Sequence, residues 1–240
     1  MGVDIYHRSQ DDLTGAEVSW GGDIMRSIKQ KNYFVLETQA QAFKNRVPFK
    51  GQLNQLVFSH IASGANMVEY WHWHSIHNSV ETYWKGILSH DFKSNPVYEE
   101  VKTTGRQLEK LSPVLVNLSI KTKTAVLVSN DSLTAIEYFP FSESSNYNDV
   151  FRRVYDTLYK NNIRTDILDT KTIDYSKYDV IFVPSLYSVA DETLNKLNDF
   201  AENGGTIVYL FKSGFTDQHV KVRTDIQPAV ISKSVGAHYE

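Results

Sequence analysis

The sequence contains no cysteine among its 240 residues. This absence excludes disulfide bonds and thiolate metal ligands, and it fits a reducing compartment, so we expect a cytoplasmic protein. No apolar run approaches the roughly 18 residues that predict a transmembrane helix. The first residues also lack the basic start and apolar core of a signal peptide. We therefore expect no membrane partner.

Neither sign of charge is in large excess, and the formal net charge is −3. Acidic and basic residues are interspersed, so nothing in the pattern indicates binding to nucleic acid or to an anionic surface. Hydrophobic residues make up 41% and charged residues 22%, which is enough apolar material for a globular core. The length suits one large domain or two ordinary ones.

The first half of the chain alternates strand-like and helix-like segments. Three short apolar segments predict strands, at residues 3–6, 32–38 and 66–73. Three segments with helical spacing follow them in turn, at residues 16–30, 51–65 and 95–112. We expect the last helix to end before Pro113. This alternation implies parallel β-α units.

The second half has the pattern of a doubly wound α/β domain. Strands are predicted at residues 123–130, 164–169, 178–185 and 206–211. Helices are predicted at residues 150–162 and 189–205. Any ligand of such a sheet is expected at the carboxyl ends of the strands. The segment 111–123 is a plausible connection, so we expect domains at 1–118 and 119–240.

The segment EYWHWHSIH, residues 69–77, combines three histidines with three aromatic side chains. His72, His74 and His77 are possible metal ligands, because neutral imidazole is the commonest metal-binding side chain. No HExxH helix and no cysteine accompanies them. The aromatic residues between them favour a hydrogen-bonding wall, and histidines packed at a strand end are a further alternative. We expect no metal and no other cofactor.

Two carboxylates come after predicted strands and are candidates for catalysis. Glu37 closes the strand at 32–38, and Glu81 lies shortly after the aromatic segment. Barrel enzymes keep their catalytic groups at the carboxyl ends of strands. Carboxylates beside tryptophans suit glycoside hydrolysis, which needs negative charge near an oxocarbenium-like centre and flat apolar faces for a sugar ring. A solvent-facing or capping role for Glu37 is the alternative, and the same holds for Asp11 and Asp12 in their loop.

The second half lacks the motifs of a catalytic α/β domain. Ser185 comes after a predicted strand, but the GxSxG pattern of a nucleophile elbow is absent. Gly204 and Gly205 precede a strand rather than a helix, so they do not form a phosphate-binding loop. We expect this half to serve packing or assembly.

Longer strings of the sequence carry a family resemblance. The strings are DIYHRSQDDLTGAE, NYFVLETQAQAF, GQLNQLVFSHIASGANMVEYWHWHSIHNSVETYWKGILSHD and KSGFTDQHVKVRT. They closely resemble β-galactosidases of glycoside hydrolase family 42, and the resemblance covers essentially the whole chain. It implies the last three strands (6–8) of a (β/α)8 barrel at 1–118. It also implies most of a middle domain at 119–240, an α/β domain similar to class I glutamine amidotransferases. A homotrimer is the assembly that it implies.

The resemblance also assigns roles to individual residues. Glu37 matches the nucleophile of the retaining reaction. Tyr6 and Asp11 match two residues that line the galactose subsite, and Glu81 matches a sugar-binding glutamate after the last strand. Trp84 stands where some family members have a histidine that contacts galactose. The expected substrate is a terminal β-D-galactoside.

Two departures from the family pattern accompany these matches. The family has a tryptophan shortly after its nucleophile, whereas here the loop reads QAFKNRVPF, with Arg46 and Val47 in that region. The family's general acid/base, in an Asn-Glu pair, lies on an earlier strand that has no match here. The sequence therefore predicts a glycoside hydrolase chain that lacks the acid/base. A non-catalytic assembly or sugar-binding fragment is the alternative.

Overall fold

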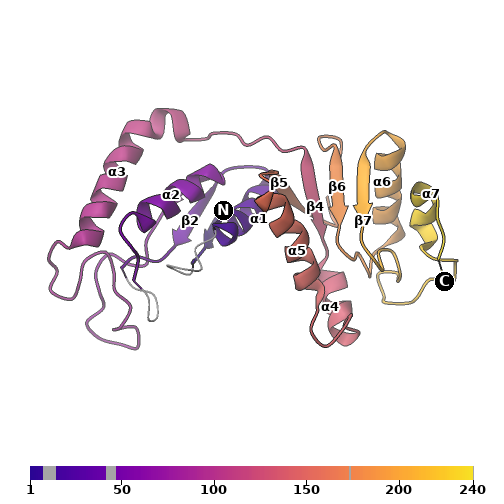
Figure 1. Ribbon diagram of the computed structural model, residues 1–240, viewed down its shortest axis with the longest axis horizontal. Helices are drawn as coiled ribbons and strands as arrows, with labels where there is room; N and C mark the ends of the chain where they lie inside the picture. Colours follow the sequence, from indigo (N-terminus) through magenta and orange to yellow (C-terminus); the bar gives the residue numbers. More distant parts are fainter. Residues whose placement is uncertain (8–14, 42–46, 173, 240) are drawn as a thin grey trace. The chain divides into compact units, whose positions relative to one another are not determined.

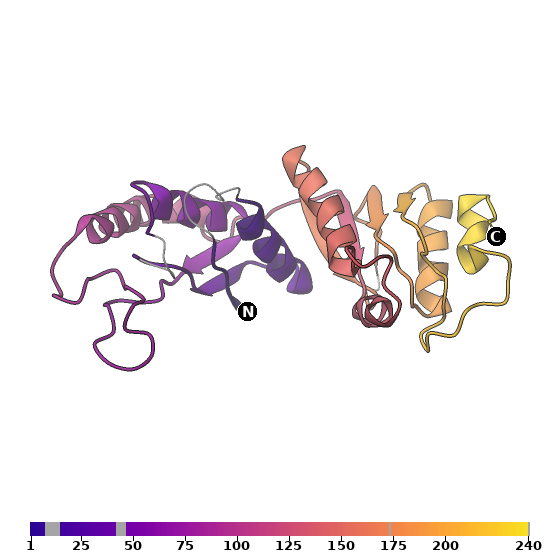
Figure 2. The same ribbon diagram turned by 60° about the horizontal axis from the view of Figure 1, so that its bottom comes forward.

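The computed structural model describes residues 1–7, 15–41, 47–172 and 174–239. The chain divides into two compact α/β units, Met1–Ile120 and Lys121–Glu240 (Figures 1 and 2). The division after Ile120 lies close to the boundary at residue 118 that the sequence suggests.

The first unit is built on a three-stranded parallel sheet in the order β1-β2-β3. Its strands are β1 (Gly2–Asp4), β2 (Tyr33–Glu37) and β3 (Ala65–Val68). The helices that come after them are α1 (Ala16–Lys29), α2 (Gln52–Ala62) and α3 (Pro96–Leu115). The expected parallel β-α units of the first half are therefore confirmed.

Helices cover one face of this sheet, and within the described residues of the unit no helix covers the other, bare face. Tyr33 and Val35 of β2 are fully buried, and apolar side chains of α1 and α2 pack against them. Phe34 and Leu36 alternate with them on the opposite face and remain 42% and 43% exposed. Figure 2 shows the helices of this unit on one side of its strands. A segment of a β/α barrel has this geometry, because barrel helices cover only the outer face of the strands.

Gly22 in the middle of α1 allows the helix to lie close to the sheet. A Cβ atom at this position would lie 2.7 Å from Cβ of Ser63 and closer still to the hydroxyl of Tyr33. Any larger residue would therefore push α1 away from β2. The glycine lowers intrinsic helix stability by about 1 kcal/mol, and the close packing that it permits offsets this loss.

The expected end of the third helix before Pro113 is wrong, because α3 continues to Leu115. A proline inside a helix lacks the N–H that would bond the carbonyl four residues earlier, here that of Glu109. In this structure the hydroxyl of Ser112 donates to that carbonyl at 3.0 Å. The neighbouring serine thus replaces the missing donor, and the last turn survives.

The third strand is shorter than the sequence suggests. We expect a strand over 66–73, but β3 ends at Val68, and Trp71 is joined to Gln39 only through an isolated parallel bridge. The aromatic and histidine side chains of 71–77 therefore lie in an irregular segment rather than on a strand. Bulky aromatic residues favour strands, but here hydrogen bonds to other segments of the unit determine the backbone.

The second unit contains a four-stranded parallel sheet in the order β5-β4-β6-β7. Its strands are β4 (Thr124–Val128), β5 (Thr165–Asp169), β6 (Val180–Val183) and β7 (Thr206–Tyr209). Its helices are α4 (Asn130–Tyr138), α5 (Tyr147–Lys160), α6 (Asp191–Glu202), the short 3-10 helix η2 (Ala229–Ile231) and α7 (Ser232–Val235). The strand order reverses between β4 and β6, which confirms a doubly wound arrangement.

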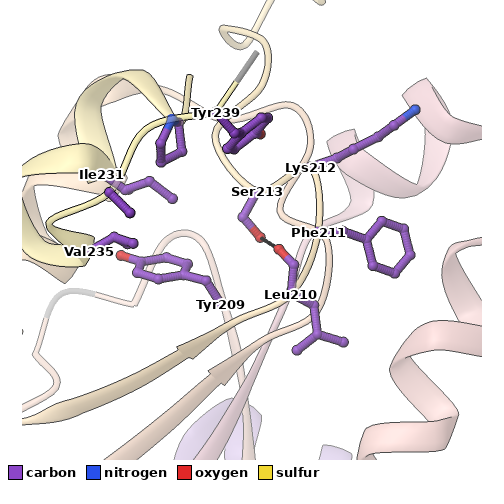
Figure 3. Close-up of a pocket in the computed structure, with 10 residues that line it drawn as sticks. Tyr209, Leu210, Phe211, Lys212, Ser213, Ile231, Val235 and Tyr239 are labelled. Atoms are coloured by element: carbon purple, nitrogen blue, oxygen red, sulfur yellow. Dashed lines mark hydrogen bonds between the residues drawn. The ribbon is translucent and has the colours of Figure 1, made fainter. Parts of the chain in front are cut away.

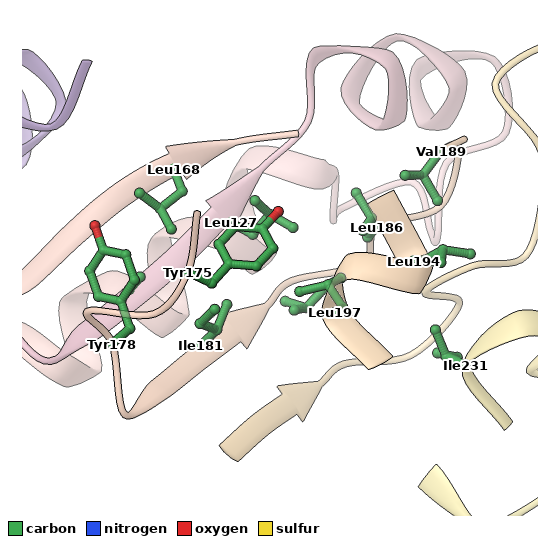
Figure 4. Packing of buried hydrophobic residues seen from close by; sticks show 12 residues of the cluster. Leu127, Leu168, Tyr175, Tyr178, Ile181, Leu186, Val189, Leu194, Leu197 and Ile231 are labelled. Atoms are coloured by element: carbon green, nitrogen blue, oxygen red, sulfur yellow. The ribbon is translucent and has the colours of Figure 1, made fainter. Parts of the chain in front are cut away.

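The core of the second unit lies between this sheet and α6. Ile181 and Val183 of β6 are fully buried against Leu194 and Leu197 of α6, and Ile231 of η2 closes the same cluster (Figure 4). On the opposite face, α5 packs over β4 and β5. Beyond it, the same face has an apolar cavity of about 500 Å³ over β6 and β7, lined by residues that include Phe182 and Val208.

Two helices of the second unit differ from the sequence expectation. Helix α4 is not predicted, since its nine residues (NDSLTAIEY) carry a weak apolar pattern. Ser129 starts it by accepting a hydrogen bond from the N–H of Ser132. Helix α5 begins at Tyr147 rather than 150, because Asn146 and Asp149 form a reciprocal capping box. Side-chain caps therefore determine the residues at which both helices begin.

None of the helices in the described part of the chain is long and apolar enough to cross a membrane.

Candidate active site

The candidate residues lie at the carboxyl ends of β1 and β2 and in the long segment after β3. Main-chain hydrogen bonds extend the sheet beyond the strands themselves. The N–H of Ile5 donates to the carbonyl of Glu37 at 3.0 Å, and the N–H of Thr38 donates to the carbonyl of Glu69 at 3.0 Å. These bonds hold three successive strand ends together at one edge of the sheet, where a barrel has its mouth.

Tyr6 and Glu37 are in direct contact at this edge. The hydroxyl of Tyr6 donates a hydrogen bond to Oε2 of Glu37 at 3.1 Å, and both residues are half-buried. Burial raises the pKa of Tyr6 well above its ordinary value, and the carboxylates of Glu37, Asp4 and Glu81 raise it further. Tyr6 therefore stays protonated at physiological pH and acts only as a donor toward Glu37. Oε1 of Glu37 makes no hydrogen bond within the described residues and is available to a ligand.

Glu81 approaches the same edge from the segment after β3. The indole N–H of Trp71 donates to Oε2 of Glu81 at 3.2 Å. The main-chain N–H of Trp71 donates to the carbonyl of Thr38, the residue after Glu37, so Trp71 joins Glu81 to this edge. The charge of Glu81 also makes a small contribution to the raised pKa of Tyr6. The structure thus brings together Tyr6, Glu37 and Glu81. Their assigned roles in binding and catalysis stay predictions.

Trp84 is joined to this group through the main chain. Its N–H donates to the carbonyl of Glu81 at 3.0 Å, and its own carbonyl accepts from Nε2 of His72 at 3.2 Å. The side chain of Trp84 is half-buried. Asp11, Asp12 and Arg46 lie outside the described residues, while Val47 is exposed.

Trp71 is a site residue that sequence reasoning misses. Its indole bonds Glu81, and its N–H donates to the carbonyl of Thr38, the residue after Glu37, at 2.8 Å. The sequence offers one signal, an aromatic residue shortly after a strand and beside the histidines. That signal does not distinguish Trp71 from Trp73, which lies two positions further and is 59% exposed.

The histidines of the segment use their ring nitrogens on main-chain carbonyls. Nε2 of His72 bonds the carbonyl of Trp84 at 3.2 Å, and Nδ1 of His74 bonds that of Ser75 at 2.9 Å. Nε2 of His77 bonds the carbonyl of His90 at 2.8 Å. Within the described ranges, no group of three or more His, Cys, Asp or Glu side chains could hold a metal ion. The metal interpretation therefore has no ligand set there, and the hydrogen-bonding interpretation describes these contacts.

Buried side chains lie at the carboxyl ends of β4 and β6 in the second unit. Ser185 comes after β6 and is fully buried, and its hydroxyl has no hydrogen-bond partner in the described part of the chain. The hydroxyl of Ser132 donates to the carbonyl of Ser188 and accepts from its N–H, both at 3.0 Å. Tyr187 stacks on Phe215 beside them, with ring centroids 5.6 Å apart. These side chains occupy the part of the edge beside β4 and β6.

An apolar cavity of about 440 Å³ lies beyond the end of β7 (Figure 3). Its lining includes Tyr209, Ile231, Val235 and Tyr239, and the hydroxyl of Ser213 donates to the carbonyl of Leu210 at 2.8 Å. Among the described residues, no carboxylate or histidine lines it. The cavity therefore has the chemistry of a packing surface and lacks the acid-base groups of a catalytic site.

Two family profiles match this chain, and the boundary between the two matches agrees with the division of the structure after Ile120. Residues 3–111 match a family profile described as β-galactosidase, and residues 122–240 match one described as β-galactosidase trimerisation domain. Between them the two matches cover nearly the whole chain. Each structural unit therefore corresponds to one family profile.

Curated relatives carry the same description. The chain is 27% identical over 225 residues to β-galactosidase LacZ of Lactobacillus acidophilus, a match that covers 91% of this chain and 33% of the relative. It is 29% identical over 210 residues to β-galactosidase GanA of Bacillus subtilis, covering 85% of this chain and 31% of the relative. The chain thus spans about a third of the length of these relatives.

A solved structure shares the fold. The structure of Gan42B, a GH42 β-galactosidase from G. stearothermophilus, superposes with a TM-score of 0.89 and 24% identity. The match covers 96% of this chain and 35% of Gan42B. The expected fold, three strands of a (β/α)8 barrel followed by an α/β domain, is confirmed. The chain belongs to glycoside hydrolase family 42, the family of these β-galactosidases.

Proposed function

We propose that the first unit contributes the nucleophile side of the active site of a retaining β-galactosidase. The hydrogen bond from Tyr6 to Glu37 at the carboxyl edge of a barrel sheet is the observation that carries this proposal. Glu37 attacks the anomeric carbon of a terminal β-D-galactoside as the bond to the leaving group breaks. Water then displaces Glu37 from the galactosyl-enzyme intermediate, and the product keeps the β configuration.

The neighbouring residues support this chemistry in different ways. Tyr6 holds Oε2 of Glu37 by its hydroxyl, which leaves Oε1 for the attack. Glu81 supplies an acceptor for sugar hydroxyl groups near the nucleophile, and Trp84 and Asp11 complete the galactose subsite. Carboxylates that accept hydrogen bonds from sugar hydroxyls fix the ring against the attacking oxygen, which lowers the entropic cost of the reaction.

The retaining mechanism also needs a second carboxyl group about 5–5.5 Å from the nucleophile, to protonate the leaving group. We propose that this general acid/base lies in a part of the enzyme outside these 240 residues. The proposal is supported by the family's Asn-Glu pair on an earlier barrel strand, and by the third of the relatives' length that this chain spans.

Substrates with different leaving groups test the proposal. Dinitrophenolate departs without protonation, so Glu37 alone can form the galactosyl intermediate from a dinitrophenyl β-galactoside, whereas lactose needs an acid. The expected result is slow turnover of the dinitrophenyl substrate by this chain and none of lactose. Glu37→Gln should abolish that turnover, and Glu69→Gln, at an exposed neighbouring carboxylate, should leave it unchanged. Turnover that survives Glu37→Gln would refute the assignment.

A non-catalytic assembly role is the second candidate function. The match of the second unit to a trimerisation domain and the apolar cavity over β6 and β7 both favour it. In this case the chain associates without turning over any galactoside. Sedimentation of the purified chain, combined with the dinitrophenyl assay, separates the two functions, because assembly without turnover supports only the second.

We propose three further features of the protein. A homotrimer is supported by the trimerisation-domain match of residues 122–240. The similarity of the second unit to class I glutamine amidotransferases is supported by its doubly wound strand order. A cytoplasmic location is supported by the absence of cysteine.

A further inference from the structure

Trp71 is anchored to the strand that carries Glu37. Its N–H donates to the carbonyl of Thr38 at 2.8 Å, and it forms a parallel bridge with Gln39. Thr38 and Gln39 are buried, with exposed fractions of 1% and 4%. Because buried, hydrogen-bonded backbone moves little, the main chain of Trp71 has a well-defined position beside the residues that directly follow Glu37, while its side chain is 36% exposed.

The segment that carries Glu81 has much less support of its own. Its neighbours Val80 and Tyr83 are 92% and 87% exposed, so few apolar contacts hold it. Nε2 of His90 bonds the carbonyl of Thr82 at 3.0 Å, and the N–H of Gln41 donates to the carbonyl of Lys85 at 3.1 Å. Two further bonds join the segment to Trp71 and His72. The indole N–H of Trp71 reaches Oε2 of Glu81 at 3.2 Å, and Nε2 of His72 reaches the carbonyl of Trp84 at 3.2 Å. The ring of His72 in turn stacks on Trp71, with centroids 5.2 Å apart and planes at 19°.

We propose that Trp71 is a positioning residue, which holds the carboxylate of Glu81 at a fixed place relative to Glu37. The inference rests on the proposed galactoside-binding function and names the residue that sets the geometry of its subsite. An indole N–H is a donor only, so it orients the carboxylate without supplying a charge or a proton. Glu81 keeps Oε1 for sugar hydroxyl groups. A carboxylate without this bond samples several rotamers and loses part of its binding energy.

A spectroscopic test examines the bond itself. The chain has four tryptophans, and Trp71→Phe identifies the indole N–H resonance of Trp71 by removing it. A hydrogen bond to a carboxylate moves that resonance downfield, so Glu81→Ala should move it upfield and increase its exchange with water. Glu69→Ala, at an exposed neighbouring carboxylate, should not. A resonance of Trp71 that is unaffected by Glu81→Ala would overturn the proposal.

A binding test examines the consequence for the sugar. The probe is isopropyl β-D-thiogalactoside, which is not hydrolysed, and the dissociation constant is measured by titration of the chain. Trp71→Phe keeps an aromatic ring but lacks the N–H, and it should weaken binding about tenfold, the effect of one bond to a charged group. In the Glu81→Ala background, the same substitution should change binding less than about twofold, because the bond is already absent.

Equal weakening in both backgrounds would overturn the proposal, since Trp71 would then act on the sugar directly. An unchanged thermal midpoint of Trp71→Phe excludes a general loss of folding as the cause. If the wild-type chain binds no thiogalactoside, the proposed function of the chain fails. The indole resonance then still decides whether Trp71 holds Glu81, so the two failures are distinguishable.

Discussion

The carboxyl-end edges of the two parallel sheets differ in the side chains that come after each strand. At the edge of the first unit, Tyr6, Glu37 and Glu81 are half-buried, and they place carboxylate oxygens beside a tyrosine hydroxyl. At the edge of the second unit, Ser132 and Ser188 bond each other, and Tyr187 covers them with Phe215. Both edges occupy the position where α/β proteins bind ligands.

The difference shows that strand topology alone does not make a site. The first edge keeps ionisable groups accessible and uses a tyrosine and a tryptophan to hold them. At the second edge, Ser132 and Ser188 bond each other and aromatic rings pack beside them, while the buried hydroxyl of Ser185 has no partner in the described part of the chain. The two edges therefore differ in chemistry, because the first has carboxylates beside a hydroxyl donor and the second has hydroxyl groups and aromatic rings.

The largest expected effect tests this contrast directly. Glu37→Gln should lower kcat/KM for a dinitrophenyl β-galactoside by about a thousandfold or more, since it removes the attacking carboxylate. Ser185→Ala, at the corresponding edge of the second unit, should change it less than about twofold, because that serine takes no part in the reaction. Comparable losses from the two substitutions would contradict the division of roles. Steady-state kinetics on both variants provide the measurement.

A second contrast concerns packing. Leu197 of α6 is fully buried, so Leu197→Ala should lower the free energy of unfolding of the second unit by about 3 kcal/mol. Leu36 on the bare face of β2 is 43% exposed. For this residue, Leu36→Ala should cost less than about 1 kcal/mol. Urea unfolding of both variants measures the two effects. A large cost for Leu36→Ala would show that the bare face is covered in solution.

The units should also differ in their response to acid. His60 of α2 is fully buried, and its ring nitrogens have no hydrogen-bond partner among the described residues. Burial lowers the pKa of His60 to about 4, with a smaller contribution from His7. In the unfolded chain the ring of His60 binds a proton near pH 6.5. Above that pH the ring is neutral in both states, and the folded unit has its full stability. As the pH falls from 6.5 toward 4, the unfolded chain binds the proton and the folded unit does not, so the free energy of unfolding decreases.

The size of this acid effect is about 3 kcal/mol for the first unit. His219 and His238 of the second unit are exposed, so that unit has no buried histidine to charge. Urea unfolding at pH 7, 6 and 5 measures the effect. His60→Leu should flatten the pH dependence, whereas His90→Gln, at an exposed histidine, should keep it. An unchanged pH slope in His60→Leu would contradict this assignment.

The smallest expected effect concerns Ser185. Its buried hydroxyl has no partner in the described part of the chain, so Ser185→Ala removes a desolvated group and no hydrogen bond. The free energy of unfolding should stay within about 0.5 kcal/mol or rise by up to about 1 kcal/mol. Thermal or urea unfolding measures it. A loss above this range would reveal a polar contact that supports the second edge.

The sequence predicts the order of strands and helices well because apolar periodicity dominates both sheets. The local exceptions have local causes. Ser112 replaces the donor that Pro113 lacks, so α3 runs on to Leu115. The short α4 depends on the cap at Ser129 rather than on an apolar stripe. Such side-chain bonds to the backbone are not visible in the spacing of apolar residues.

The candidate site is only partly predictable from the sequence. Glu37 and Glu81 can be found because carboxylates after strands are a recognisable pattern, and the family resemblance adds Tyr6. Trp71 cannot be found in the same way, because its importance comes from an irregular segment that lies against Thr38 and Gln39. Tertiary contacts rather than periodicity place its indole beside Glu81.

The central claim is that Glu37 is the nucleophile, and one measurement tests it most directly. A dinitrophenyl fluorodeoxygalactoside carries a leaving group that needs no acid, and its fluorine slows hydrolysis of the galactosyl-enzyme intermediate. After incubation with this chain, mass spectrometry of its peptides should find the fluorodeoxygalactosyl group on Glu37. Glu37→Gln should remain unlabelled. A label on another residue, or an unlabelled wild-type chain, would contradict the claim.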